Sequence, residues 1–194
     1  MIKIGITGGI GSGKTVVSTL LELMDIPVYI ADEESKVLTK NSPVIREKLI
    51  HLLGESIYTP EGLNKKLLAS YIFNNPDCLQ QVNAIIHPVV NQHFLEWTNQ
   101  LTTGVCAIES AILFESGFDK IVDISLMIYA PMELRIERAM KRGSVTREEI
   151  TKRIQSQLSD DIKKEKADYI IRNNDKQALI PQLQNFINRL TFND

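Results

Sequence analysis

The sequence predicts an α/β fold in which helices flank a five-stranded parallel sheet. Five short apolar runs have strand character, and they lack the alternation of polar and apolar residues typical of half-exposed strands, so they suit a sheet that is covered on both faces. Stretches of helical pattern separate the runs, as the connections of a parallel sheet require. Because a chain of 194 residues buries one substantial core, we expect a single domain over residues 1–194.

The first expected strand has apolar residues at Ile2, Ile4 and Ile6, and a helical pattern follows from Val16. The segment between them, residues 8–15, matches G-x-x-x-x-G-K-[ST], the Walker A phosphate-binding loop. Its glycines let the backbone adopt conformations that a Cβ forbids and donate N–H groups to phosphates at close range. The helix N-terminus adds partial positive charge. The segment therefore predicts a P-loop fold with a site for ATP.

Individual residues of this loop have expected roles. Lys14 reaches the β and γ phosphates as a point charge, and the Thr15 hydroxyl is placed to ligate Mg²⁺. The cofactors that we expect are therefore ATP and Mg²⁺. The expected nucleotide contacts in this segment are Gly9, Gly11, Ser12, Gly13, Lys14, Thr15 and Val16.

Two insertions interrupt the expected sheet. The remaining strands are predicted at residues 26–30, 105–108, 124–129 and 169–171. An insertion at 32–103 follows the second strand, and another at 132–165 follows the fourth. The core of the domain is then formed by residues 1–31, 104–131 and 166–194.

The first insertion, residues 32–103, reads as helical throughout. Ser42-Pro43 is a helix-start signal, and Gly54 ends that helix. Asn75-Pro76 begins another helix, and a longer one should run from about residue 88 to 101. By analogy with other P-loop kinases, a helical subdomain at this place holds the phosphate acceptor.

The second insertion predicts a small lid. Residues 133–142 form a basic amphipathic helix, Gly143-Ser144 breaks it, and a capping box that starts at Thr146 opens the next helix, which carries Arg153 and Gln157. Lids of kinases exclude water and deliver cations to the transferring phosphoryl group. The alternative is that these arginines form the solvated face of an ordinary surface helix.

Two carboxylates are placed for chemistry. Asp32 follows the second strand directly and should stand at the carboxyl edge of the sheet, beside the phosphate loop, where ligands bind in open α/β sheets. It would accept the proton of the acceptor hydroxyl, orient that hydroxyl or ligate Mg²⁺; alternatively it only favours a helix N-terminus. Glu109 ends the third strand in the position usual for a Walker B acid and would reach the metal, directly or through water.

Two further segments leave their roles open. His87 precedes Pro88, which suggests a helix start where neutral imidazole is favoured, and a lone histidine is more often a capping or core group than a catalyst. Residues 111–117 form an apolar turn that ends in an acid and a glycine. By periodicity alone, Leu113 and Phe114 suit a packed core at least as well as the wall of a substrate site.

Composition narrows the class of protein. The chain has 22 basic and 24 acidic residues for a net charge of −2, which does not indicate nucleic acid as a partner. Cys78 and Cys106 match no metal-binding or redox spacing and suit reduced thiols. No apolar run approaches the length that spans a bilayer, and no targeting leader is visible. We therefore expect no membrane partner, a cytoplasmic location and, as the simplest assembly, a monomer.

Seven segments in order resemble the dephospho-CoA kinase family, and the resemblance covers residue 1 to about residue 187. The segments are 7–15, 31–32, 86–90, 112–115, 138–142, 153–157 and 167–173. The loop is specific by itself, whereas the others gain specificity from their order and spacing. The resemblance implies transfer of the γ-phosphate of ATP to the ribose 3′-hydroxyl of dephospho-CoA.

The resemblance also implies roles for particular residues. Asp32 matches the aspartate that the family uses as catalytic base, and Arg138 and Arg142 match its lid arginines. Asn173 lies in a segment that approaches the adenine of ATP. His87 and the segment Leu113, Phe114 and Glu115 match regions near the acceptor.

The chain departs from the family pattern at three positions. Ile30 replaces the first aspartate of an Asp-Ala-Asp signature, Lys36 stands where an arginine is usual, and Ala111 replaces a proline. These departures concern contacts with the acceptor and leave the second aspartate intact. Alternatives to the implied function are another small-molecule or nucleoside monophosphate kinase and a regulatory nucleotide switch, although no guanine-reading Asn-Lys-x-Asp segment is present.

Overall fold

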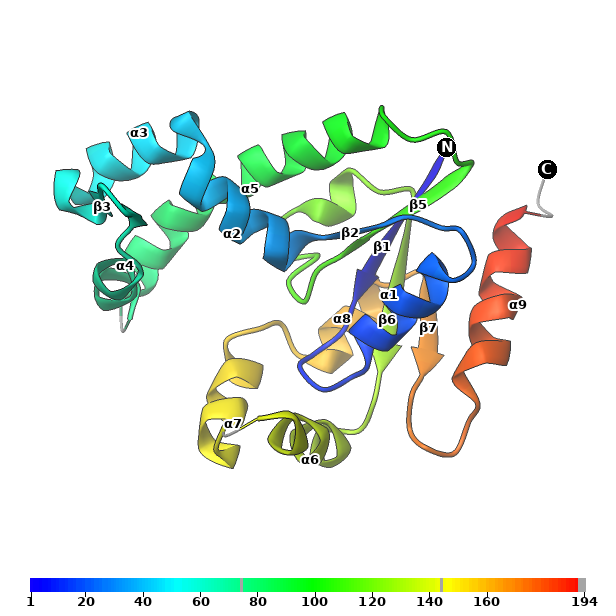
Figure 1. The fold of residues 1–194 in the computed structure, drawn as a ribbon. Helices are drawn as coiled ribbons and strands as arrows, with labels where there is room; N and C mark the ends of the chain where they lie inside the picture. The colour runs from blue at the N-terminus through cyan, green and yellow to red at the C-terminus, as the bar shows by residue number, and fades with distance from the viewer. Residues whose placement is uncertain (74, 144, 192–194) are drawn as a thin grey trace. The chain divides into compact units, whose positions relative to one another are not determined.

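The computed structural model describes residues 1–73, 75–143 and 145–191 and divides the chain into two compact units. The core unit comprises Met1–Tyr29 and Thr102–Asp194, and the helical unit comprises Ile30–Leu101. Figure 1 shows both as ribbons. Each unit has its own buried residues.

A five-stranded sheet forms the centre of the core unit, with strand order β2-β5-β1-β6-β7. β1 pairs in parallel with both β5 and β6, and β6 pairs in parallel with β7. The strands are β1 (Ile2–Thr7), β2 (Val28–Ile30), β5 (Val105–Glu109), β6 (Ile124–Tyr129) and β7 (Tyr169–Arg172). The predicted α/β class and all five predicted strands are confirmed, because each continuous apolar run is buried within this sheet.

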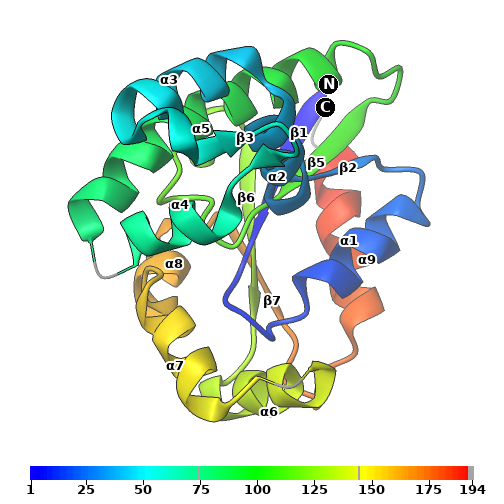
Figure 2. The same cartoon turned by 60° about the vertical axis from the view of Figure 1, so that its left-hand side comes forward.

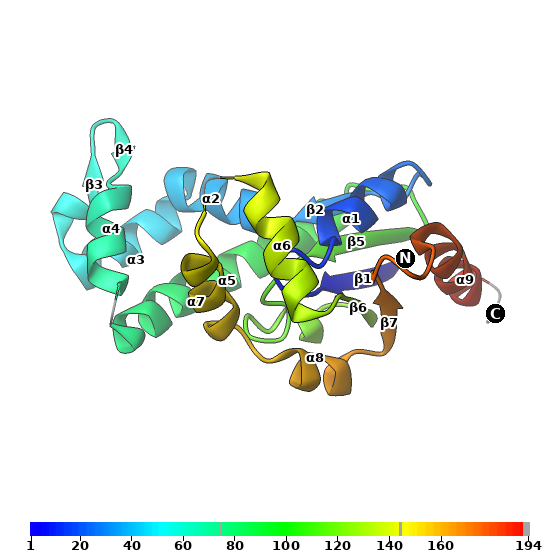
Figure 3. The same ribbon diagram turned by 90° about the horizontal axis from the view of Figure 1, so that it is seen from below.

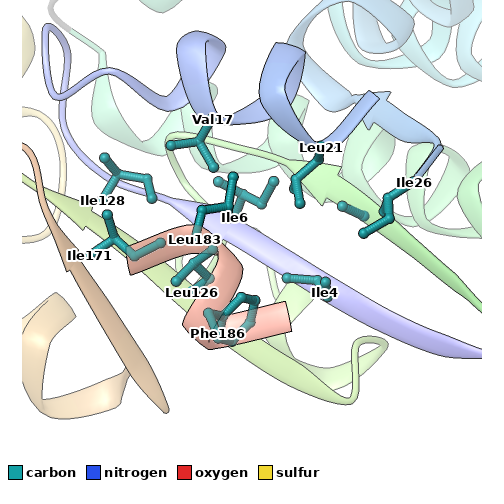
Figure 4. Packing of buried hydrophobic residues seen from close by; sticks show 11 residues of the cluster. Ile4, Ile6, Val17, Leu21, Ile26, Leu126, Ile128, Ile171, Leu183 and Phe186 are labelled. Carbon is teal, nitrogen blue, oxygen red and sulfur yellow. The ribbon is translucent and has the colours of Figure 1, made fainter. Parts of the chain in front are cut away.

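Helices α1 (Lys14–Glu22) and α9 (Leu179–Thr191) cover one face of this sheet. Their side chains pack on alternate residues of the central strands, as Figure 4 shows. The buried residues labelled there include Ile4 and Ile6 of β1, Leu126 and Ile128 of β6, Val17 and Leu21 of α1, and Leu183 and Phe186 of α9. Because each such aliphatic side chain contributes roughly 1.5–3 kcal/mol when fully buried, this layer holds the start of α1 firmly against β1.

The opposite face of β1 is covered by the turn after β5. A Cβ on Gly5 would lie 2.9 Å from Leu113 Cδ2, so the leucine packs directly onto the strand backbone. Leu113 is fully buried there. A short 3-10 helix, η2 (Phe118–Lys120), then leads the chain back towards β6.

Three helices connect β6 to β7, and Figure 3 shows them in succession. They are α6 (Met132–Arg142), α7 (Arg147–Gln155) and α8 (Asp160–Lys166). α6 ends where the glycine was predicted to stop it, although Ser144 lies outside the described residues. The capping box is confirmed, because the Thr146 side chain accepts from Glu149 N–H and the Glu149 carboxylate accepts from Thr146 N–H. Gln157 lies beyond the end of α7, so its predicted place in that helix is wrong.

The helical unit contains four α-helices among its described residues, and Figure 2 gives a second view of them. Its elements are α2 (Ala31–Asn41), α3 (Pro43–Leu53), the 3-10 helix η1 (Glu55–Ile57), β3 (Tyr58–Thr59), β4 (Gly62–Leu63), α4 (Lys65–Ile72) and α5 (Pro76–Thr98). Ser42 caps α3 as predicted. The prediction of helix throughout is wrong, because β3 and β4 pair as a small antiparallel hairpin. Gly62, the first residue of β4 after the turn, has a φ of 116°, a conformation that L side chains rarely adopt.

The long helix α5 differs from its prediction in one respect. It begins at Pro76 and continues through Pro88 to Thr98 instead of restarting at Pro88. An interior proline costs about 3 kcal/mol, but Ile86, Val90 and Phe94 of α5 are buried at four-residue spacing across it. Burial of these three side chains outweighs the cost, since each contributes roughly 1.5–3 kcal/mol. Within the described residues no helix, α5 included, is long and apolar enough to cross a membrane.

Candidate functional site

The phosphate loop lies between β1 and α1 with its backbone in conformations that require glycine. Gly8, Gly11 and Gly13 have φ angles of 146°, 75° and 100°. A Cβ on Gly8 would lie 2.4 Å from the Ile128 carbonyl oxygen, so a side chain has neither a favourable conformation nor space there. The Lys14 ammonium donates to the Gly8 carbonyl oxygen at 2.9 Å, which holds the lysine across the loop. The loop therefore has the glycine-dependent backbone that the sequence predicts for a phosphate-binding loop.

Two hydroxyl groups of this region are buried without a hydrogen-bond partner among the described residues. They are Thr7 Oγ1, at the end of β1, and Ser12 Oγ, within the loop. A buried polar atom left unsatisfied costs about 1–3 kcal/mol, so these two hydroxyls call for a partner from outside the chain. Phosphate oxygens would complete them, because the loop also stands at the N-terminus of α1.

Glu109 lies at the carboxyl end of β5, paired in register with Ile6 of β1. It is 8% exposed and accepts a hydrogen bond from Ser18 Oγ at 2.7 Å. Ser18 lies one turn after Thr15 on α1, so residues 15 and 18 share the helix face that contacts Glu109. Hydroxyl and carboxylate oxygens are the ligands that Mg²⁺ prefers, and this pair fits that metal. Thr15 and Val16 are exposed in the first turn of α1.

Asn173 closes the other side of the loop. Its side-chain amide donates to the Ser12 carbonyl oxygen at 2.8 Å, and its backbone N–H donates to the Tyr129 carbonyl oxygen at 2.8 Å. Arg138 donates to the Asn173 carbonyl oxygen at 3.0 Å and pairs with Asp175. The structure thus brings together the predicted Asn173, the predicted Arg138 and the phosphate loop. Arg142 lies exposed in the last turn of α6.

Arg135 is a residue at this site that the sequence analysis missed. It is 2% exposed, and a Cβ on Gly9 would lie 1.5 Å from its Nη1 atom. Its Nη2 atom donates to the Asp160 carboxylate at 2.7 Å. The sequence signal that could have identified Arg135 was its position on the helix. It stands four residues before Ala139 and beside Ile136, on the apolar side of the helix, whose other cations are more exposed.

The turn at residues 111–117 is bonded to α8 and to the residues just before it. The Glu115 carboxylate accepts from the Leu158 backbone N–H at 2.8 Å and pairs with the buried Lys163 ammonium at 3.3 Å. Lys163 also donates to the Ala111 carbonyl oxygen at 2.6 Å. Phe114 is half-buried, with a lysine ammonium of α8 5.8 Å from the centre of its ring. The packing alternative holds for Leu113, whose side chain faces the core and not solvent.

In the helical unit, Asp32 lies exposed in the first turn of α2, followed by Glu33 and Glu34. His87 lies in the middle of α5, so the prediction of a helix start there is wrong. Partial burial nevertheless lowers the pKa of His87 below its usual value, which favours the neutral imidazole. The physical cause is desolvation of the charged form and not a helix N-terminus.

The helical unit also contains a pocket of about 500 Å³. Three ammonium groups line it, from Lys36 and Lys40 of α2 and Lys65 of α4. Apolar side chains of Leu63, Leu68 and Ile86 form the rest of its wall, together with Ser35, Thr39 and Glu61. A cavity lined by several cations and by aliphatic side chains suits a ligand that carries both phosphate and apolar groups.

Both cysteines are free thiols, as predicted. Cys106 lies inside β5, and burial raises the pKa of its thiol to about 11. A thiol with such a pKa stays protonated and unreactive at neutral pH. Cys106 therefore contributes to packing of the sheet.

Known proteins resemble this chain over nearly its full length. Residues 2–178 match the family model described as dephospho-CoA kinase. A dephospho-CoA kinase of Bacteroides fragilis (strain YCH46) is 51% identical over 187 residues, which are 96% of this chain and 91% of that protein. The crystal structure of TT1252 from Thermus thermophilus has a TM-score of 0.82 at 29% identity and covers 98% of this chain and 96% of its own. The dephospho-CoA kinase from Campylobacter jejuni has a TM-score of 0.62 at 23% identity, with 97% and 95% covered, and shares the fold.

Proposed function

This chain belongs to the dephospho-CoA kinase family and phosphorylates dephospho-CoA with ATP, and from that premise we propose how its residues divide the reaction. The observation that carries the proposal is the phosphate loop with its two unpaired buried hydroxyls. Phosphoryl transfer needs in-line positioning, neutralisation of charge and a group that takes the proton of the acceptor. Each requirement has a candidate residue.

Charge neutralisation falls to cations around the loop. Lys14 would contact the β and γ phosphates, while the backbone N–H groups of Gly9 to Thr15 and the neighbouring Val16 hold the phosphate chain. Mg²⁺ would be held by the Thr15 hydroxyl and, directly or through water, by Glu109, and it would supply charge stabilisation to the transferring phosphoryl group. Asn173 would lie beside the adenine. Arg138 and Arg142 would bring further positive charge from α6 when the transition state forms.

The acceptor side is assigned to the helical unit. Asp32 would accept the proton of the ribose 3′-hydroxyl, with His87 of the same unit near the acceptor. Of the core unit, Phe114 and Glu115 would also serve the acceptor, whereas Leu113 is packed in the core. The pocket lined by three lysines supports this assignment, because dephospho-CoA carries a diphosphate next to its adenosine and an extended arm with both aliphatic and amide groups. Lys36 retains the positive charge of the arginine that is usual at this position in the family.

A panel of acceptors tests the proposal. The purified chain is incubated with MgATP and, separately, with dephospho-CoA, AMP or CMP, and the products are identified by mass spectrometry and phosphorus NMR. We expect coenzyme A from dephospho-CoA, phosphorylated at the 3′ position, and much slower turnover of the monophosphates. A Lys14→Ala preparation serves as the control for contaminating kinases. Absence of coenzyme A, or faster turnover of a monophosphate, would overturn the proposal.

The sequence also predicts a monomer in the cytoplasm, and both predictions have direct tests. Light scattering of the purified chain measures its mass, for which we expect 21.9 kDa. Fractionation of producing cells measures the location. A dimer mass or recovery with membranes would contradict these expectations.

A further inference from the structure

A buried arginine lies against the phosphate loop. Among the described residues only two cations are buried, Arg135 and Lys163. The Arg135 Nη2 atom donates to Asp160 Oδ2 at 2.7 Å, and its Nε atom has no hydrogen-bond partner in the described part of the chain. Burying a guanidinium is costly even when it is paired, and an apolar residue would fill the same space at no such cost. The arginine therefore calls for a role beyond packing.

Contacts with two loop glycines indicate what that role is. The Arg135 Nη1 atom occupies the space where a Cβ of Gly9 would stand, with only 1.5 Å between the two positions. The carbonyl oxygen of Arg135 lies 2.2 Å from the position of a Cβ on Gly11. The side chain and backbone of one residue thus cover two of the four loop glycines, Gly9 and Gly11. Gly9 and Gly11 precede Ser12, whose hydroxyl is one of the unpaired groups of the site.

Asp160 anchors the arginine from a separate helix. It is the first residue of α8, where the helix N-terminus favours a carboxylate. α8 is itself held by Lys163, which donates to the Ala111 carbonyl oxygen and pairs with Glu115. The guanidinium is consequently fixed between α8 and the loop. A planar, five-donor group held at one end is better suited to this than a flexible ammonium.

We propose that Arg135 is a positioning residue for phosphoryl transfer. Paired with Asp160, it holds Gly9 and Gly11 in the conformation that aims the loop's N–H groups at the phosphates of ATP. It acts through the loop and does not itself contact the reacting atoms. This inference rests on the proposed nucleotide site and adds to it a residue outside the Walker A segment.

The proposal predicts that substitution of Arg135 impairs the use of ATP and leaves the use of dephospho-CoA nearly unchanged. Because a misplacement of about 1 Å at a reacting group can cost about 100-fold in rate, we expect Arg135→Gln to lower kcat/KM for ATP by about 10- to 100-fold. KM for dephospho-CoA should stay within about twofold, since the acceptor is assigned to other residues. Arg135→Lys should recover part of the loss, because it retains the charge beside Asp160 but not the planar group over Gly9.

The experiment compares Arg135→Gln, Arg135→Lys and Asp160→Asn with the wild-type chain. Lys141→Ala is the matched control, since Lys141 lies on the same helix and pairs with Glu137 but is exposed. Steady-state kinetics give KM and kcat for both substrates, calorimetry gives the dissociation constant of ADP, and circular dichroism gives the unfolding midpoint. We expect weaker ADP binding in all three variants, weakest in Arg135→Gln, and no change in the control.

Two outcomes would overturn the proposal. In the first, Arg135→Gln has a lowered unfolding midpoint, but its ADP affinity and its KM for ATP stay within twofold of wild type. That result would mean that the arginine only stabilises the fold. If that variant does not fold, wild-type ADP affinity in both Arg135→Lys and Asp160→Asn has the same meaning. Failure of the proposed function is distinguishable, because the wild-type chain would then make no coenzyme A whatever the ADP affinities of the variants.

Discussion

Gly13 is the position at which the structure allows a loop substitution to be worked out in most detail. Its φ of 100° is one that L residues rarely adopt, and it forms the N-cap of α1. A Cβ there would lie 2.2 Å from Asn173 Nδ2, far inside normal contact distance. The Asn173 amide would have to move, and its 2.8 Å hydrogen bond to the Ser12 carbonyl oxygen would break.

The expected cost of Gly13→Ala has two parts. Placing a residue with a Cβ in a left-handed conformation costs about 1–2 kcal/mol. Loss of the Asn173 hydrogen bond adds about 0.5–1.5 kcal/mol. We therefore expect the free energy of unfolding to fall by about 1.5–3.5 kcal/mol, taking the sum of these two ranges.

A double-mutant cycle separates the two parts. Urea unfolding is followed by circular dichroism for the wild type, Gly13→Ala, Asn173→Ala and the double variant. Once Asn173 is truncated, the alanine at position 13 costs only the backbone term, so the double variant should be more stable than additivity predicts by about 0.5–1.5 kcal/mol. Gly104→Ala is the control, because a Cβ there meets nothing within 4 Å. Additivity within about 0.3 kcal/mol would refute the reasoning.

Three further predictions concern charge. Lys14→Ala should lower kcat by more than about tenfold, because a cation at the transferring phosphoryl group is lost. Fixed-time assays of coenzyme A formation measure kcat, and a smaller loss would contradict the role of Lys14. Asp32→Asn should leave ADP binding by calorimetry nearly unchanged and lower kcat by about 10² to 10⁴, whereas wild-type turnover would leave Asp32 as a helix-terminal acid. Asp168 accepts from Ser125 Oγ at 2.6 Å and from Ser125 N–H at 2.8 Å, and these bonds lower the pKa of its carboxyl below 3.8. The stabilising contribution of Asp168 is therefore present above that pH and is lost as pH falls through the lowered pKa. The free energy of unfolding of Asp168→Asn, measured in urea, should therefore depend less on pH below about 4 than that of the wild type. Equal acid dependence in both proteins would contradict this.

Much of the fold followed from local pattern. The five strands were predictable because buried parallel strands are continuous apolar runs, and the observed strand ends lie close to the predicted ones. The phosphate loop was predictable for a different reason, since Gly11 and Gly13 adopt positive φ angles that only glycine takes readily. Ser42 and Thr146 were predictable as caps because a side-chain oxygen satisfies helix N–H groups within three residues.

The features that were predicted wrongly or not at all lack a clear local signal. Pro88 looked like a helix start because local propensity opposes an interior proline, but burial of its helical neighbours outweighs that preference. The β3–β4 hairpin is only two residues per strand, too short to produce a periodic signal. Glu115 accepts from the Leu158 N–H just before α8, more than forty residues later in the chain, and no local pattern indicates this contact.

The sequence by itself determined the sheet, the phosphate loop and the family, because these depend on backbone preferences and on segments whose residues are neighbours in the chain. Only the tertiary structure decided which side chains surround the loop. Arg135 looks like one cation among several on α6, and its burial against Gly9 arises because Asp160, 25 residues later, pairs with it. Charge and helical pattern are local properties, whereas desolvation and pairing depend on which distant elements pack together.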